Sequence, residues 1–124
     1  MKRALLLFAH GARDPRWALP FEEVARRIRA AAPDVPVALS FLEFMTPGIV
    51  EAGHALAAEG CTRVEVVPLF LGAGGHVRKD LPALLDELRA AHPQVQWLLR
   101  RTVGEEQTVI DAMASCALQG PTDA

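Results

Sequence analysis

Four short apolar runs alternate along this chain with segments whose apolar residues recur at helical spacing. Because each right-handed crossover returns the chain to the same end of a sheet, such alternation builds a mostly parallel sheet. We therefore expect an α/β fold, an open, doubly wound, mostly parallel four-stranded sheet with flanking helices. The expected strands are residues 4–9, 36–42, 64–70 and 95–99, and the expected helices are about 15–32, 47–58, 77–91 and 105–118.

The length of 124 residues fits one domain, which we place at residues 1–119, followed by a flexible polar tail at 120–124. One core of this size leaves no room for two lobes around a large ligand, so a big substrate would need a second copy. The first apolar run is short and meets His10 directly, which indicates a buried strand and not a signal peptide.

Charge and cysteine content narrow the possible partners. A formal net charge of -2 lacks the basic excess that binding to nucleic acid requires. The apolar runs are too short to span a membrane. Cys61 and Cys116 lie far apart, which argues against a disulfide framework or a zinc cluster and for a reduced, cytoplasmic protein. We expect neither nucleic acid nor membrane as a partner.

Three side chains that can bind a metal ion or accept a proton follow the first three strands: His10, Glu43 and His76. In open α/β sheets, ligands bind beyond the carboxyl ends of the strands, near the point where strand order reverses. Two neutral imidazoles can hold a borderline divalent metal, and an incomplete protein shell leaves positions open through which the ion can be handed on. A carboxylate beside them could hold the cation or accept protons. These residues are therefore the candidate metal site.

Each residue also has a plainer explanation. Taken alone, His10 could equally well be a strand-end residue that hydrogen-bonds the backbone and has no functional role. His76 and Glu43 could be solvated side chains. The loop before His76 carries Gly72, Gly74 and Gly75, which favours close approach by a flat ligand. A phosphate cradle is disfavoured because Gly-Lys-Ser/Thr does not follow.

The other histidines and several cations receive weaker assignments. His54 lies within an expected helix and His92 at the end of another, where imidazoles are commonly solvated, so neither enters the candidate site. The cations that flank the same crevice could pair with ligand carboxylates, although exposed cations are usually only solvated. They are Arg13, Arg16, Arg78 and Lys79.

Three segments resemble the small class II chelatases that act on sirohydrochlorin, the CbiX and SirB group. Residues 7–15 resemble the amino-terminal His-Gly-Ser-Arg-Asp-Pro signature of that family, with Ala12 in place of serine. Residues 41–44 with Pro47 resemble its second-strand segment, and residues 67–77 with 80–82 match its third and most specific one. The resemblance covers nearly the whole chain and keeps the spacing between the segments.

The resemblance implies a lyase that inserts Co²⁺ or Fe²⁺ into sirohydrochlorin, for cobalamin or siroheme synthesis, with the metal as substrate and no organic cofactor. His10 corresponds to a metal ligand and proton acceptor, His76 to the second metal ligand, and Glu43 to the acidic residue beside the metal. It further implies a homodimer. Nickel is less expected, because the histidine-rich stretch of the nickel branch is missing here. The residues expected to contact the tetrapyrrole are Arg13, Met45, Phe70, Leu71, Gly72, Ala73, Gly74 and Gly75.

Other functions stay open at this point. A metal or tetrapyrrole carrier would use the same residues without turnover, and a flavodoxin-like interaction module would need only the fold. A histidine phosphatase is disfavoured, because that family requires arginine directly before the histidine and this chain has Ala9.

Overall fold

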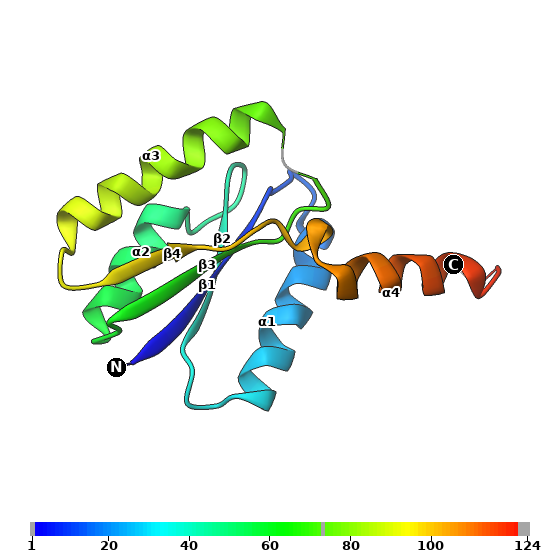
Figure 1. Ribbon diagram of the computed structural model, residues 1–124, viewed down its shortest axis with the longest axis horizontal. Coiled ribbons are helices and arrows are strands. Elements are labelled where there is room, and N and C mark those ends of the chain that lie inside the picture. The colour runs from blue at the N-terminus through cyan, green and yellow to red at the C-terminus, as the bar shows by residue number, and fades with distance from the viewer. Residues whose placement is uncertain (1, 73, 122–124) are drawn as a thin grey trace.

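A single four-stranded sheet forms the centre of the computed structural model, which describes residues 2–72 and 74–121, with the backbone but not the side chain of His76 (Figure 1). The strands lie in the order β2-β1-β3-β4, and every neighbouring pair is parallel. The expected doubly wound α/β fold is confirmed, with a sheet that is wholly parallel. The strands are β1 (Arg3–Ala9), β2 (Val37–Phe41), β3 (Arg63–Pro68) and β4 (Gln96–Leu99).

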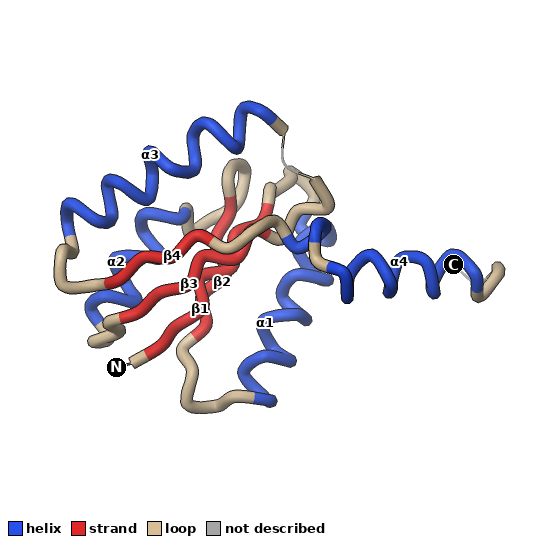
Figure 2. Tube along the Cα trace, viewed as in Figure 1, coloured by secondary structure: helices blue, strands red, loops and turns tan. Residues whose placement is uncertain are grey.

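Helices cover both faces of the sheet (Figure 2). A 3-10 turn, η1 (Pro15–Ala18), and helix α1 (Leu19–Ala31) lie on one face, while α2 (Ile49–Ala58) and α3 (Gly75–Ala91) cover the other. Side chains alternate along β1, so Leu6 and Phe8 join the core beneath α2 and α3, and Leu5 and Leu7 join the core beneath α1. Because helices cover both faces of this central strand, its side chains must be apolar on both faces, which explains the continuous apolar run in the sequence.

The last helix forms where expected but does not cover the sheet. After a 3-10 turn, η2 (Val103–Glu105), helix α4 (Gln107–Leu118) projects away from the domain, and no residue of it is buried among those that the structure describes (Figure 1). The charged side chains of Arg63 and Glu65 alternate with the buried valines of β3, so this part of the sheet offers little apolar surface to a helix.

Most element boundaries differ from expectation by one or two residues, and two of them lie beside the site. The helix predicted from residue 47 begins at Ile49, because Pro47 and Gly48 run beside the end of β2, where the Phe41 N–H donates to the Pro47 carbonyl at 2.9 Å. Strand β3 ends at Pro68 and not at Phe70. Within the described ranges, no helix is both long enough and apolar enough to cross a lipid bilayer. Most of the predicted tail, residues 122–124, lies outside the described part.

Candidate metal centre

The strand order reverses at β1, because the chain passes first to β2 on one side and then to β3 on the other. The loops after β1 and β3 therefore leave the sheet in different directions and open a crevice between them. His10 is the first residue after β1, and Glu43 follows β2 by two residues. Both candidate residues lie at this carboxyl edge, as their positions in the sequence predict.

The structure brings the side chains of His10 and Glu43 together. The His10 Nε2 atom lies 3.2 Å from Glu43 Oε1, and the two side chains are 52% and 49% exposed. The main chain sets this spacing, since the Glu43 N–H donates to the His10 carbonyl at 3.1 Å and the Leu42 N–H donates to the Ala9 carbonyl at 2.9 Å. These bonds extend the pairing of β1 with β2 beyond the strands and hold the two loops side by side.

Gly11 makes this close approach possible. Its φ is +96°, and a Cβ atom added there would lie 1.9 Å from the carbonyl oxygen of Glu43. Any other residue would be strained by the backbone conformation and would push the two loops apart. Gly11 thus fixes the position of Glu43 relative to His10 without contributing a side chain.

A cavity of about 490 Å³ opens beside the pair. Phe70, which is 8% exposed, stands edge-on to His10 with ring centroids 6.1 Å apart, and it packs against Phe8 at 5.7 Å. The imidazole and the carboxylate therefore face a space with a firm aromatic wall, of a size common among small-molecule sites. The cavity is lined by His10, Leu42, Glu43, Phe70, Gly72, Gly74 and Val77.

His76 is placed only by its backbone. It is the second residue of α3, which begins beside the cavity, but its side chain and the whole of Ala73 lie outside the described structure. In the described part of the chain, no three His, Cys, Asp or Glu residues converge on one ion. The candidate ligands whose side chains the structure describes are therefore His10 and Glu43, and metal binding by these two and by His76 stays a prediction.

The predicted glycine loop borders the cavity. Cβ atoms added at Gly72, Gly74 and Gly75 would meet no described atom within 4 Å, so packing inside the chain does not demand glycine there. Leu71 is 69% exposed at the tip of this loop. The open space around these residues is where a flat ligand could approach the backbone.

Gly104 is a constrained residue that the sequence analysis missed. Its N–H donates to the Phe70 carbonyl at 2.8 Å, and a Cβ atom added to it would lie 1.8 Å from the carbonyl oxygen of Leu71. The loop after β4 is thereby joined to the loop after β3. Its position shortly after the fourth predicted strand was the feature of the sequence from which its importance could have been predicted.

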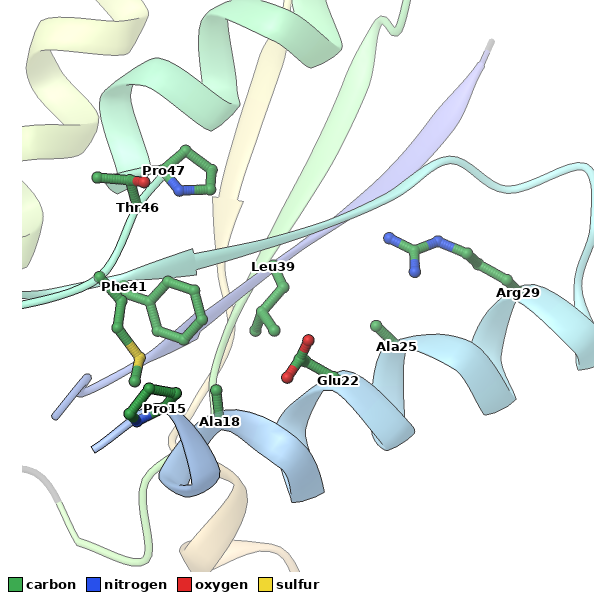
Figure 3. A pocket seen from close by; sticks show the side chains of 10 residues that line it. Pro15, Ala18, Glu22, Ala25, Arg29, Leu39, Phe41, Thr46 and Pro47 are labelled. Atoms are coloured by element: carbon green, nitrogen blue, oxygen red, sulfur yellow. The ribbon is translucent and has the colours of Figure 1, made fainter. Parts of the chain in front are cut away.

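Two predicted substrate contacts lie apart from this cavity lining. The Arg13 guanidinium lies 5.0 Å from the ring centroid of Phe44, a solvent-exposed residue with a φ of 65°. Met45 lines a larger pocket, of about 590 Å³, between α1 and β2. Figure 3 shows that Glu22 and Arg29 of α1 point toward β2 in this pocket. This pocket is larger than the cavity beside His10, but its described lining contains no pair of histidine and carboxylate side chains.

A basic pocket of about 300 Å³ adjoins the cavity and shares Phe70 and Val77 with it. Arg78, Arg100 and Arg101 all line this second pocket. Each lies at ion-pair distance from a carboxylate, at 3.5 Å from Glu105, 3.9 Å from Glu65 and 3.7 Å from Glu106 respectively, so a bound carboxylate would share or replace these partners. The sequence analysis considered Arg78 but not the two arginines that follow β4, although their position at a strand end was visible. Arg16 is committed elsewhere, since its hydrogen bonds to Asp14 hold the pKa of that carboxyl below its ordinary value.

Comparisons with known proteins agree with the observed fold. The family model described as CbiX matches residues 4–119. A "Sirohydrochlorin cobaltochelatase" of Sulfurisphaera tokodaii is 28% identical over 112 residues, which are 88% of this chain and 86% of that protein. A "Sirohydrochlorin ferrochelatase" of Priestia megaterium is 29% identical over 111 residues, 89% of this chain but 41% of the relative, so the chain spans less than half of that protein. Among solved structures, a CbiX protein from Marinobacter aquaeolei VT8 superposes with a TM-score of 0.82 at 30% identity, covering 94% of this chain and 95% of the other.

Proposed function

Because the chain belongs to the CbiX family, we propose that it inserts a divalent metal ion, Co²⁺ or Fe²⁺, into sirohydrochlorin, supplying cobalamin or siroheme synthesis. The names of the relatives from S. tokodaii and P. megaterium, which specify cobalt and iron, support this choice of metals. The observation that carries the proposal is the His10–Glu43 pair, held at 3.2 Å beside a cavity at the reversal of strand order.

Insertion requires that the metal shed water and that two pyrrole N–H groups of the ring lose their protons. We assign metal binding to His10 and His76, with Glu43 beside the ion, and transfer of the two pyrrole protons, one after the other, to His10 or Glu43, whose half-exposed side chains pass them to the solvent. Two or three protein ligands leave coordination positions for the ring nitrogens, whereas a closed four-ligand site would retain the ion. Metal and ring are both substrates, and we expect no organic cofactor.

The ring is proposed to lie in the cavity against Phe70 and the loop at residues 71–75. Sirohydrochlorin carries several carboxylates, and guanidinium groups bind carboxylates through paired, charge-assisted hydrogen bonds. The adjoining pocket presents Arg78, Arg100 and Arg101 next to the wall that both cavities share. We assign carboxylate binding to these arginines, while Arg13 and Met45 lie farther along the same edge of the sheet.

A homodimer is part of this proposal, and we place it in the cytoplasm. Helix α4 exposes Ile110 and Met113 by 42% and 41%, and Leu118 by 87%, which is the kind of apolar surface that a second copy would cover. Ile110→Glu with Met113→Glu should shift the protein from dimer to monomer in analytical ultracentrifugation, while Ser115→Glu on the same helix should leave the dimer intact. A wild-type monomer at all concentrations would refute the dimer.

The decisive experiment follows the absorption of sirohydrochlorin mixed with the protein and Co²⁺. Wild-type protein should insert metal over many turnovers per chain, whereas His10→Ala and Glu43→Gln should be slower by about 100-fold or more, the usual contribution of a positioned acid or base. Glu51→Gln, a surface carboxylate on α2, serves as the matched control. A single stoichiometric binding event without turnover would instead favour the carrier function, and unchanged rates in both variants would refute the site.

A further inference from the structure

Two histidines with no part in the metal centre face each other on another part of the surface. His54 lies on α2 and His92 is the residue that ends α3; His54 is exposed and His92 is half-buried. The His54 Nδ1 and His92 Nε2 atoms are 2.7 Å apart, with ring centroids 4.9 Å apart and an interplanar angle of 63°. We propose that His54 and His92 form a second site for a borderline divalent metal ion, separate from the catalytic cavity.

The pair lies far from the cavity. Helix α3 begins at Gly75, beside the cavity, and runs for 17 residues to Ala91. At a rise of about 1.5 Å per residue, the helix carries the chain about 25 Å before it reaches His92. An ion held there could not contact a ring in the cavity, so the proposed site is peripheral and does not depend on the chelatase activity.

The packing of α2 on α3 brings these two histidines together. Gly53 lies so close to Leu88 that an added Cβ atom would sit 2.7 Å from Leu88 Cδ2. His54 is the next residue after Gly53, and His92 is one helical turn beyond Leu88. The backbone of His92 is fixed as well, because its N–H donates to the Leu88 carbonyl at 2.9 Å and its carbonyl accepts from Val95 at 3.0 Å.

The geometry suits an ion that replaces the shared proton. Two imidazole nitrogens bound to one Zn²⁺ at about 2.0–2.1 Å in tetrahedral geometry are separated by about 3.3 Å, so the rings need to open by only about 0.6 Å. His54 is exposed and His92 is half-buried, so the His54 ring has the freedom to make most of that movement. Imidazole pairs select Co²⁺, Ni²⁺, Cu²⁺ and Zn²⁺ over Mg²⁺ and Ca²⁺, with Cu²⁺ bound most tightly, and water would complete the coordination.

A neighbouring indole provides a reporter. The Trp97 ring lies 6.1 Å from the His92 ring and is 3% exposed. A paramagnetic ion on the pair would therefore quench the fluorescence of Trp97. The chain has two tryptophans, so Trp17→Phe makes Trp97 the only source of the signal.

The test is titration of the full-length Trp17→Phe protein with Ni²⁺, followed by Trp97 fluorescence, and titration of the wild type with Zn²⁺ by calorimetry. Ni²⁺ should quench the emission saturably, and His54→Gln should weaken that binding by more than about tenfold, the smallest loss that even outer-shell changes cause at metal sites. His92→Gln should do the same, and circular dichroism would show that both variants are folded.

Independence from the catalytic site is tested with His10→Ala. This variant should keep the saturable quenching, whereas it should lose metal insertion. Calorimetry should show one fewer Zn²⁺ site in His54→Gln than in wild type. Absence of quenching in the Trp17→Phe protein, or equal quenching in His54→Gln, would overturn the proposal and leave the pair as a hydrogen bond between two helices, without bearing on the chelatase function.

Discussion

Replacing Gly11 by alanine should damage both the fold and the proposed metal centre, because this residue lies where the loops after β1 and β2 touch. Its φ of +96° is a conformation that residues with a side chain rarely adopt, and the added methyl would lie 1.9 Å from the Glu43 carbonyl oxygen. The contact can be relieved only if the backbone at Glu43 moves away from His10. That movement would break the 3.1 Å hydrogen bond from the Glu43 N–H to the His10 carbonyl.

The magnitude follows from two effects. A left-handed backbone conformation costs about 1–2 kcal/mol in a residue with a Cβ atom. Loss of one main-chain hydrogen bond, together with the displacement forced by an overpacked contact, adds about 2 kcal/mol. We therefore expect Gly11→Ala to lower the free energy of unfolding by about 3–4 kcal/mol, a large share of the stability that a small domain possesses.

Gly60 supplies a matched control. It has a similar φ of +87°, but a Cβ atom added there would meet no described atom within 4 Å. Gly60→Ala should thus cost only the conformational part, about 1–2 kcal/mol. Urea unfolding followed by circular dichroism gives both values. Calorimetry with Co²⁺ in a His54→Gln background, which lacks the second proposed site, reports binding at the proposed metal centre, which only Gly11→Ala should weaken. Equal losses of stability in the two variants would refute the role of the close contact.

Three further changes have expected outcomes. Gly104→Ala should lower stability by about 2 kcal/mol and weaken sirohydrochlorin binding, measured by absorption titration, because its methyl would collide with Leu71. Leu88→Ala should cost about 2–5 kcal/mol in urea unfolding, since this side chain is fully buried. The hydrogen bond from Arg3 lowers the pKa of Glu65 below its unfolded value of about 4.5, so this carboxylate stabilises the fold above that pH and loses its contribution as the pH falls through the folded pKa. Glu65→Gln should therefore destabilise the protein by about 1–2 kcal/mol at pH 7 and by progressively less as the pH falls below about 4.5, and a difference that stays constant on acidification would contradict this linkage.

The sequence predicted the sheet well because its strands are apolar on both faces. The run at 4–9 could only be a central strand, and β1 lies between β2 and β3. Strand-end positions likewise predicted that His10 and Glu43 would share one edge, although not that they would lie 3.2 Å apart. That distance depends on hydrogen bonds between two loops, which residue spacing cannot reveal.

Features that depend on tertiary contacts were not predictable in the same way. Helical periodicity located α4 correctly but could not show that it projects from the domain, because that outcome depends on the charged face of β3. The pairing of His54 with His92 could not be predicted either, since the two lie 38 positions apart in the sequence and the packing of α2 on α3, with Gly53 against Leu88, brings them together.

The main-chain ties between the loops have a consequence for how this scaffold could diversify. Peptide groups at residues 9–10 and 42–43, and not the side chains at 10 and 43, keep the two loops in register. Exchange of those side chains for other donor types would alter ion preference while the supporting framework kept its shape. The backbone at the carboxyl edge would thus stay in place while substitutions at positions 10 and 43 alone change which ion the proposed site prefers.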